Sequence, residues 1–249
     1  MYNFFISEND INESTAVIGG GDFNHVKNVL RMKIGEQILV SCGGYSHLCE
    51  IESFGDGQVI AKIIERDCSD ASLPIEIYLF QGLPKSDKME LIIQKAVELG
   101  VSEIIPVEMK RCVVKLEEKK ADSKIARWQS IAESAAKQSK CTKIATVKSV
   151  MPFAGAIEFV KKLDMLILPY ENKEGMKATA DALKQIKKGQ KIGILIGPEG
   201  GFEDSEIDRA AESGAKIISL GKRILRTETA AITAMSMLML YAETELGEK

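Results

Sequence analysis

Hydrophobic and polar positions divide the chain into two unlike parts. Over residues 1–72, short apolar runs separated by glycine turns predict β-strands. The expected strands cover residues 37–42, 46–53 and 58–65, with Gly43-Gly44 and Gly55-Asp56-Gly57 as turns between them. A short helix over 25–31 is expected before them, and the turn-rich stretch 69–74 is the expected domain boundary. The pattern therefore predicts a small, mostly β module.

From residue 75 onward, strand-like and helix-like patterns alternate. Apolar runs of strand length occur at 75–80, 103–107, 145–150, 164–168, 191–196 and 216–220. Segments of helical periodicity occur at 87–99, 122–139, 205–213 and 228–243. Alternation of this kind predicts an α/β fold whose parallel sheet is covered on both faces.

Two helix starts carry capping signals. Asp87 and Glu90 stand three residues apart, as in a capping box, and Gly100 follows where the helix should end. Thr227 is placed to cap the final helix. We therefore expect side-chain caps at both positions.

Two glycine-containing loops follow apolar strands. The first, residues 196–202, reads IGPEGGF, contains neither GK[ST] nor GxGxxG, and loses one amide donor at Pro198. Ligands bind at the carboxyl ends of strands in open α/β sheets, so the position of this loop suits ligand binding. The same residues are equally compatible with a structural turn. The second loop, 220–230, carries Arg223 and Arg226 around an apolar pair, which suits a ligand with an apolar body and polar rim. The missing fingerprint disfavours a Rossmann-type nucleotide enzyme.

Charge is unevenly distributed. The chain has 33 Lys+Arg and 36 Asp+Glu, and a net charge of −3 argues against a surface that grips nucleic acid everywhere. Residues 1–72 hold 5 basic and 11 acidic residues, a net of −6, whereas residues 110–143 hold 10 and 4, a net of +6. The basic segment suits a polyanionic partner, and it equally suits a solvated helix face.

Compartment and metal signals are weak. No apolar run approaches the roughly 20 residues of a spanning helix, and the N-terminus lacks the features of a secretory signal. The five cysteines are scattered, and Cys42, His47 and Cys49 are too few ligands for a zinc site. We expect a cytoplasmic protein with reduced cysteines that uses neither a membrane nor a metal.

Five strings in order resemble the ribosomal RNA small subunit methyltransferase E family, of the SPOUT class. They are HVKNVLRMKIGE at 25–36, KSDKMELIIQKAVELGV at 85–101, RWQSIAESAAKQS at 127–139, IGPEGGF at 196–202 and LGKRILRTETAA at 220–231. The resemblance implies a SPOUT-type domain with a deep trefoil knot over 73–249 and a PUA-like β-barrel over 1–72 that binds or orients RNA. It also implies a homodimer that uses S-adenosyl-L-methionine to methylate N3 of one uridine in 16S rRNA of the small ribosomal subunit.

The resemblance also assigns cofactor positions, mostly by their backbone groups. They are Leu168, Pro169, Tyr170, Gly197, Glu199, Gly200, Gly201, Leu220, Gly221, Ile224, Leu225, Thr229 and Ala230. Ile224 and Leu225 would cover the adenine.

Catalytic and RNA-binding roles are expected on charged residues. Arg226 would stabilise charge on the uracil oxygens, and Glu199 or Glu228 would accept the N3 proton. An acid in the first helical turn is also favourable without any catalytic role, which applies to Glu228. The expected RNA contacts are Arg31, Lys85, Lys88, Arg111, Arg127, Lys137, Lys140, Lys143 and Arg223.

Two other functions fit the same strings. One is a SPOUT methyltransferase that acts on tRNA or on another rRNA base, and the other is a non-catalytic RNA-binding or ribosome-assembly factor that keeps the fold. The acidic module leaves open how far residues 1–72 contact RNA.

Overall fold

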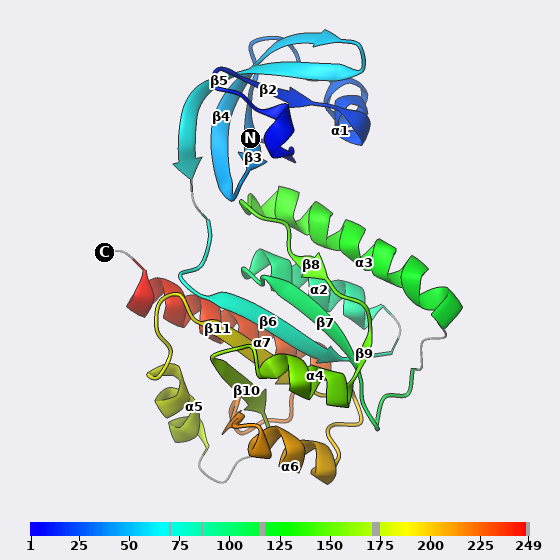
Figure 1. Ribbon diagram of the computed structural model, residues 1–249, viewed down its shortest axis with the longest axis vertical. Coiled ribbons are helices and arrows are strands. Elements are labelled where there is room, and N and C mark those ends of the chain that lie inside the picture. The colour runs from blue at the N-terminus through cyan, green and yellow to red at the C-terminus, as the bar shows by residue number, and fades with distance from the viewer. Residues whose placement is uncertain (70, 86, 115–117, 171–174, 248–249) are drawn as a thin grey trace. The chain divides into compact units, whose positions relative to one another are not determined.

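A computed structural model describes residues 1–69, 71–85, 87–114, 118–170 and 175–247 (Figure 1). The chain forms two compact units, Met1–Ser72 with Ala136–Ile144, and Leu73–Ala135 with Ala145–Lys249. Asp70 of the expected boundary and Lys115 and Glu117 of the basic segment lie outside the described residues. The first division falls between residues 72 and 73, but residues 136–144, which we expected in the C-terminal domain, cluster with the N-terminal unit.

The N-terminal unit is built on a five-stranded mixed sheet in the order β1-β3-β4-β5-β2. The strands are β1 (Asn3–Phe5), β2 (Thr15–Ile18), β3 (Gln37–Cys42), β4 (Tyr45–Gly55) and β5 (Gln58–Ser69). Strands β1 and β3 are parallel and the other pairs antiparallel, and no ladder joins β1 to β2 among the described residues. The expected barrel is therefore found as a mixed sheet. The expected short helix is found as α1 (Gly20–Asn24) followed by a π-helical turn (His25–Val29).

Alternating side chains of this sheet form the core of the N-terminal unit. Val40 and Ile38 of β3, Ile51 of β4 and Val59 of β5 are fully buried. They pack in one cluster with Phe4 and Ile18, as expected for strands with one face turned inward. Gly43 with Gly44, and Asp56 with Gly57, provide the positive φ angles that the tight turns need.

Residues 136–144 are bound to this sheet by polar contacts within the unit. Asn3 Nδ2 donates to the carbonyl of Cys141 (3.1 Å), and Lys137 Nζ lies 2.6 Å from Asp22 Oδ1. Asn3 is buried, and its Oδ1 accepts a hydrogen bond from Ser41 Oγ (2.8 Å). The segment adds three lysines and no acid, so the net formal charge of this unit rises from −6 to −3.

The C-terminal unit contains a seven-stranded sheet in the order β12-β10-β11-β6-β7-β8, with β9 also beside β7. Its strands are β6 (Glu76–Gly82), β7 (Glu103–Glu108), β8 (Thr146–Val147), β9 (Met151–Pro152), β10 (Met165–Pro169), β11 (Lys191–Ile196) and β12 (Lys216–Ile218). Every pair is parallel, which confirms the predicted parallel sheet. Strands β6 and β11 lie at its centre, and their apolar runs are buried because helices cover both faces.

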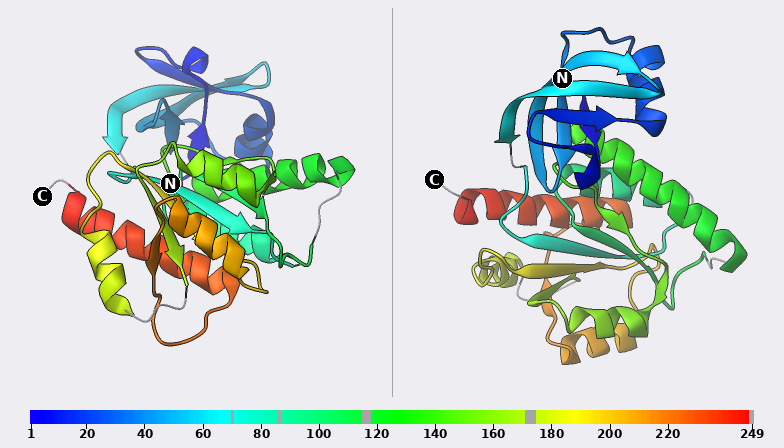
Figure 2. Two further views of the ribbon diagram at one scale, coloured as in Figure 1. Left: turned by 60° about the horizontal axis from the view of Figure 1, so that its bottom comes forward. Right: turned by 45° about the horizontal axis from the view of Figure 1, so that its top comes forward.

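Helices lie on both faces of this sheet. They are α2 (Lys88–Glu98), α3 (Glu118–Ser139), α4 (Phe153–Val160), α5 (Met176–Leu183), α6 (Asp204–Glu212) and α7 (Thr227–Tyr241). In Figure 2, α4 and α6 lie on one face of the sheet, and α2 and α7 lie on the other. Helices α4 and α5 were not predicted from the pattern. No described helix is both long and apolar enough to cross a membrane.

Both predicted helix caps are wrong. Asp87 precedes α2 without a side-chain capping bond, and Glu90 pairs instead with Arg127, whose Nε lies 2.7 Å from Glu90 Oε1. At α7 the N-cap position belongs to Arg226, and Thr227 is the first helical residue. Thr227 Oγ1 donates to the carbonyl of Gly197 at 2.6 Å. In both places a tertiary contact takes up the side chain that local sequence assigned to the helix end.

Candidate active site

Loops that follow three parallel strands pack closely at one edge of the C-terminal sheet. A Cβ atom at Gly82, the end of β6, would lie 2.7 Å from the backbone nitrogen of Pro198, which follows β11. A Cβ at Gly200 would lie 2.9 Å from Cβ of Arg111, which follows β7. Because real Cβ contacts are longer than this, both glycines permit an approach that any other residue would prevent. Gly82 and Gly200 thus allow three strand ends to come together.

A buried glutamine joins two of these loops. Gln81 is fully buried, and its Nε2 donates to Thr227 Oγ1 (2.9 Å) and to the carbonyl of Gly82 (2.9 Å). Because Thr227 Oγ1 in turn donates to Gly197, this chain of bonds connects the end of β6, the end of β11 and the start of α7. Gln81 was not predicted as a site residue. Its signal in the sequence is one polar residue at the end of the apolar run IYLF.

A lysine lies between two glutamates at the same edge. Lys88 Nζ lies 3.1 Å from Glu199 Oε1 and 3.3 Å from Glu228 Oε2. The Oε2 atom of Glu228 is buried and, apart from this ion pair, has no hydrogen-bond partner among the described residues. The two carboxylates raise the pKa of Lys88, foremost Glu199, which accepts a hydrogen bond from the ammonium group. Its charge is therefore already balanced within the protein.

Glu199 is ionised at neutral pH. Burial acts to raise its pKa, but hydrogen bonds from the backbone N–H groups of Lys85 and of Glu199 itself, together with Lys88, outweigh burial and lower it. Glu199 Oε1 accepts the Lys85 N–H at 3.0 Å. A carboxylate with a lowered pKa is a weak base, so this environment suits a binding role better than proton abstraction.

A buried carboxylate holds the loop after β7. Glu206 is buried, and its Oε1 accepts the N–H of Lys110 (3.0 Å) while its Oε2 accepts the N–H of Glu203 (2.9 Å). The side chain of Lys110 also pairs with Glu203, and Arg111 Nη1 donates to the carbonyl of Gly200 (3.4 Å). These bonds place Arg111 beside the glycine loop.

The structure brings the three predicted cofactor stretches, 168–170, 197–201 and 220–230, to one edge of the sheet. The N–H of Tyr170 donates to the carbonyl of Ile218 (2.9 Å), which joins the end of β10 to the end of β12. The rings of Tyr170 and Phe202 are edge to face with centroids 6.4 Å apart, which joins the end of β10 to the loop after β11. Leu168 is buried, and Pro169, Leu220, Leu225 and Ala230 are half-buried.

The chemistry of this edge fits a nucleoside cofactor. Ile224 is 91% exposed, an apolar side chain in water that a flat aromatic group would cover. Gly201 and Gly221 have positive φ angles, and nothing lies within 4 Å of either Cβ position, so their backbone is open to approach. The buried Gln81 Oε1 has no hydrogen-bond partner among the described residues. Apolar cover, bare backbone and an unused acceptor together match a purine nucleoside.

The predicted catalytic arginine is unengaged. Arg226 is exposed, and its side chain makes no hydrogen bond or ion pair to the other described residues. It occupies the N-cap position of α7, directly before Thr227. Its guanidinium is therefore available to a ligand at the edge where the loops meet.

The predicted RNA contacts are divided between the two units. The N-terminal unit holds Arg31, Lys137, Lys140 and Lys143, and the C-terminal unit holds Lys85, Lys88, Arg111, Arg127 and Arg223. Lys88, Arg127 and Lys137 each pair with a carboxylate, which reduces the charge they present to a phosphate. Arg31, Lys140 and Arg223 are exposed and make no ion pair within the described residues.

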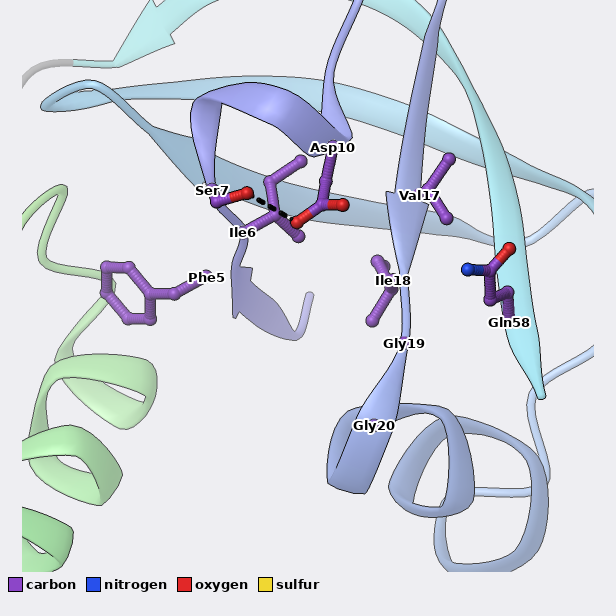
Figure 3. Close-up of a pocket in the computed structure, with 9 residues that line it drawn as sticks. All are labelled: Phe5, Ile6, Ser7, Asp10, Val17, Ile18, Gly19, Gly20 and Gln58. Atoms are coloured by element: carbon purple, nitrogen blue, oxygen red, sulfur yellow. Dashed lines mark hydrogen bonds between the residues drawn. The ribbon is translucent and has the colours of Figure 1, made fainter.

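A separate hollow of about 380 Å³ lies in the N-terminal unit (Figure 3). Its polar side chains are Ser7, Asp10 and Gln58, and Ser7 Oγ donates to Asp10 Oδ2 at 2.6 Å. None of the predicted site residues lines it. Across the described residues, no group of three or more His, Cys, Asp or Glu is placed to hold a metal ion.

Comparison with known proteins matches two family profiles to successive parts of the chain. A family profile described as RNA methyltransferase domain matches residues 71–239, and one described as RNA methyltransferase PUA domain matches residues 18–64. The parallel sheet and its clustered loops therefore define an RNA methyltransferase with an N-terminal PUA domain.

Relatives that match along nearly the whole chain identify the family within this class. The chain is 37% identical over 256 residues to ribosomal RNA small subunit methyltransferase E of Bacillus subtilis (strain 168), with all of both chains covered. It is 32% identical over 232 residues to that of Mesomycoplasma hyopneumoniae (strain 232), covering 93% of this chain and 96% of the other. The crystal structure of the Neisseria gonorrhoeae protein of this name, bound to S-adenosyl methionine, has a TM-score of 0.81 at 30% identity and covers 96% and 97% of the two chains. The chain belongs to the ribosomal RNA small subunit methyltransferase E family.

Proposed function

We propose that this protein transfers a methyl group from S-adenosylmethionine to N3 of one uridine in 16S rRNA of the small ribosomal subunit. The observation that carries the proposal is the meeting of residues 168–170, 197–201 and 220–230 at one edge of the sheet, beside the unengaged Arg226. The names of the relatives support the substrate, and the cofactor bound to the Neisseria gonorrhoeae protein supports the methyl donor. The cytoplasm, where ribosomal subunits are found, is its proposed location.

The cofactor would be held mainly by backbone groups. Amides and carbonyls of 168–170, 197–201 and 220–221 would bind its adenine and ribose edges, and Ile224 with Leu225 would cover the adenine. Thr229 and Ala230 would line the side formed by α7. When bound, S-adenosylmethionine supplies a methyl group already activated by its sulfonium. We also propose that the C-terminal domain contains the deep trefoil knot that the resemblance to the family implies.

The chain's residues would prepare the uracil. Holding the target base in line with the methyl group can contribute about 7–11 kcal/mol to the lowering of the barrier. The N3 proton must leave before the nitrogen lone pair can attack, and negative charge then develops on O2 and O4. Arg226 would stabilise that charge, because its guanidinium is free of competing carboxylates in the described structure.

Glu228 is the better supported proton acceptor of the two glutamates. Its Oε2 has an ion pair with Lys88 but accepts no hydrogen bond from the described residues, whereas Glu199 is stabilised as the anion by backbone N–H groups as well as by Lys88. In this arrangement Glu199 would hold Lys88 and the backbone of Lys85 in place, and Lys88 would orient Glu228.

RNA would be contacted by the exposed cations. Arg31, Lys140 and Arg223 carry no internal ion pair in the described residues and are proposed phosphate contacts.

Helix α7 has apolar residues on all sides, with Leu240 59% exposed, and a helix of this composition is normally buried all round. Leu91 of the neighbouring α2 is 42% exposed and extends the surface. A second copy of the chain would cover this surface. Sedimentation equilibrium should therefore show a dimer, and the Leu240→Arg variant should be a monomer.

The decisive experiment is methyl transfer from labelled cofactor to small ribosomal subunits that lack the modification. Digestion and mass spectrometry of the product should give 3-methyluridine from 16S rRNA, and Arg226→Ala should abolish the transfer while cofactor affinity stays measurable. Lys222→Ala is the matched control, because it removes an exposed cation four residues away to which no role is assigned. Label in tRNA or in another nucleoside would favour a different SPOUT specificity. A protein without affinity for S-adenosylmethionine would be a non-catalytic factor.

A further inference from the structure

Gln81 has a fixed orientation at the carboxyl end of β6. Its Nε2 lies 2.9 Å from both the Gly82 carbonyl and Thr227 Oγ1. Turning the amide over would place its oxygen against two oxygen atoms, one of which, Thr227 Oγ1, already gives its hydrogen to Gly197. The amide group therefore donates in both directions, and its oxygen points elsewhere.

The oxygen that remains is buried and unused. Gln81 is fully buried, and Oε1 finds no donor among the described residues. A buried acceptor without a partner carries its full desolvation cost, and such groups in native proteins call for a specific reason. Residues before it in β6, from Ile77 to Phe80, are apolar and buried, so an apolar side chain would be the simpler choice for packing.

We infer that the carbonyl oxygen of Gln81 accepts a hydrogen bond from an amino or hydroxyl group of the bound cofactor, while its NH2 group holds the two cofactor loops together through Thr227. The inference rests on the proposed function. S-adenosylmethionine has such donors in three places: the adenine amino group, the ribose hydroxyls and the α-ammonium group. The Gln81 amide lies between the loop after β11 and the start of α7, the two segments proposed to bind that cofactor.

Two substitutions separate the acceptor from the link between the loops. Gln81→Met removes both, at similar volume. Thr227→Val keeps the shape of Thr227 but removes the hydroxyl, so the link is lost while Gln81 Oε1 stays. Thr227→Ser keeps the hydroxyl and serves as the conservative control.

Calorimetric titration of each purified full-length protein with S-adenosylmethionine is the test. Gln81→Met should weaken binding by about 5- to 150-fold, the range expected when a buried polar partner is removed. Thr227→Val should weaken binding less than Gln81→Met, and Thr227→Ser should stay near the wild type. Titration with 5′-methylthioadenosine, which lacks the amino-acid part, identifies the donor. If only the affinity for the whole cofactor falls in Gln81→Met, the donor is the α-ammonium; if both affinities fall, it belongs to the nucleoside.

A purely structural glutamine would behave differently. Gln81→Met would then melt at a lower temperature, yet its folded form would bind the cofactor as tightly as the wild type, and that result overturns the inference. If the wild type itself has no affinity, the proposed function fails and this inference fails with it.

A measurement on the wild type covers the case in which Gln81→Met does not fold. The side-chain NH2 resonances of Gln81 should shift when S-adenosylmethionine is added, because hydrogen bonding to the carbonyl polarises the amide. Unchanged resonances in a protein that binds the cofactor would contradict the inference.

Discussion

Substitution of Gly200 by alanine should test whether the glycine loop must pack closely against the segment at Arg111 in order to bind the cofactor. The added methyl group would lie 2.9 Å from Arg111 Cβ and 3.0 Å from the Arg111 carbonyl oxygen. The φ angle of Gly200 is not in the positive region, so the backbone itself accepts alanine and the whole penalty comes from this contact. Because a backbone atom is involved, the loop or the segment at Arg111 must shift.

The size of the effect follows from the cost of overpacking. Forcing a methylene-sized group into a packed site costs about 1–3 kcal/mol. If the loop relieves the contact by moving away from the conformation that binds the cofactor, the dissociation constant for S-adenosylmethionine should rise about 5- to 150-fold. The melting temperature should fall by only a few degrees, since Gly200 itself is exposed.

Titration calorimetry and thermal unfolding of Gly200→Ala measure the two quantities. Gly55→Ala is the matched control, because nothing lies within 4 Å of its Cβ position and its φ angle is ordinary. Wild-type affinity together with a lowered melting temperature would mean that the loop is packed against Arg111 but is not part of the cofactor site. Wild-type values for both would refute the close approach itself.

Three further predictions concern other parts of the molecule. Ile224→Ser should leave the melting temperature unchanged, because the side chain is 91% exposed, but should weaken cofactor binding about tenfold through lost apolar cover, measured by the same titration. Lys140→Ala should reduce the slope of log K against log salt for RNA binding by about 0.7–0.9, whereas Lys137→Ala, whose charge Asp22 already balances, should change stability more than the slope; equal slopes in both variants would contradict this. Burial lowers the pKa of His47 from 6.5, so the unfolded chain binds the proton more readily; stability should be fully present above pH 6.5 and fall as the pH drops below it, and His47→Gln should flatten that dependence in urea unfolding series.

Charge shows how tertiary structure changes the interpretation of a sequence. The basic segment 110–143 was one uninterrupted candidate for an RNA surface. In the structure its last residues, 136–143, belong to the acidic N-terminal unit, where Lys137 is paired with Asp22. Arg127 is likewise paired with Glu90. Part of the positive charge is thus used in ion pairs within the fold, and exposed residues such as Lys140 remain available to bind RNA phosphates.

The elements that local patterning determined are those with a long or regular apolar run. β3 and β11 have the predicted bounds, and α2 differs from its prediction by one residue at each end. β1, with three residues, and β2, with four, are too short for their periodicity to stand out. Helix α4 buries residues at helical spacing, but with eight residues it spans only about two turns, so its pattern is also too short to stand out.

The alternation of strands and helices, the two glycine loops and the family likeness follow from the sequence alone, because each is a pattern among neighbouring residues. The contacts of the polar side chains at the site depend on the three-dimensional fold. Gln81 and Thr227 are 146 positions apart, and Thr227 and Gly197 are 30 apart. Their bonds exist because parallel strands place their carboxyl ends at one edge, where residues distant along the chain meet. A threonine suited to cap a helix was therefore used to join two loops, and a glutamine at the end of an apolar run became part of the site.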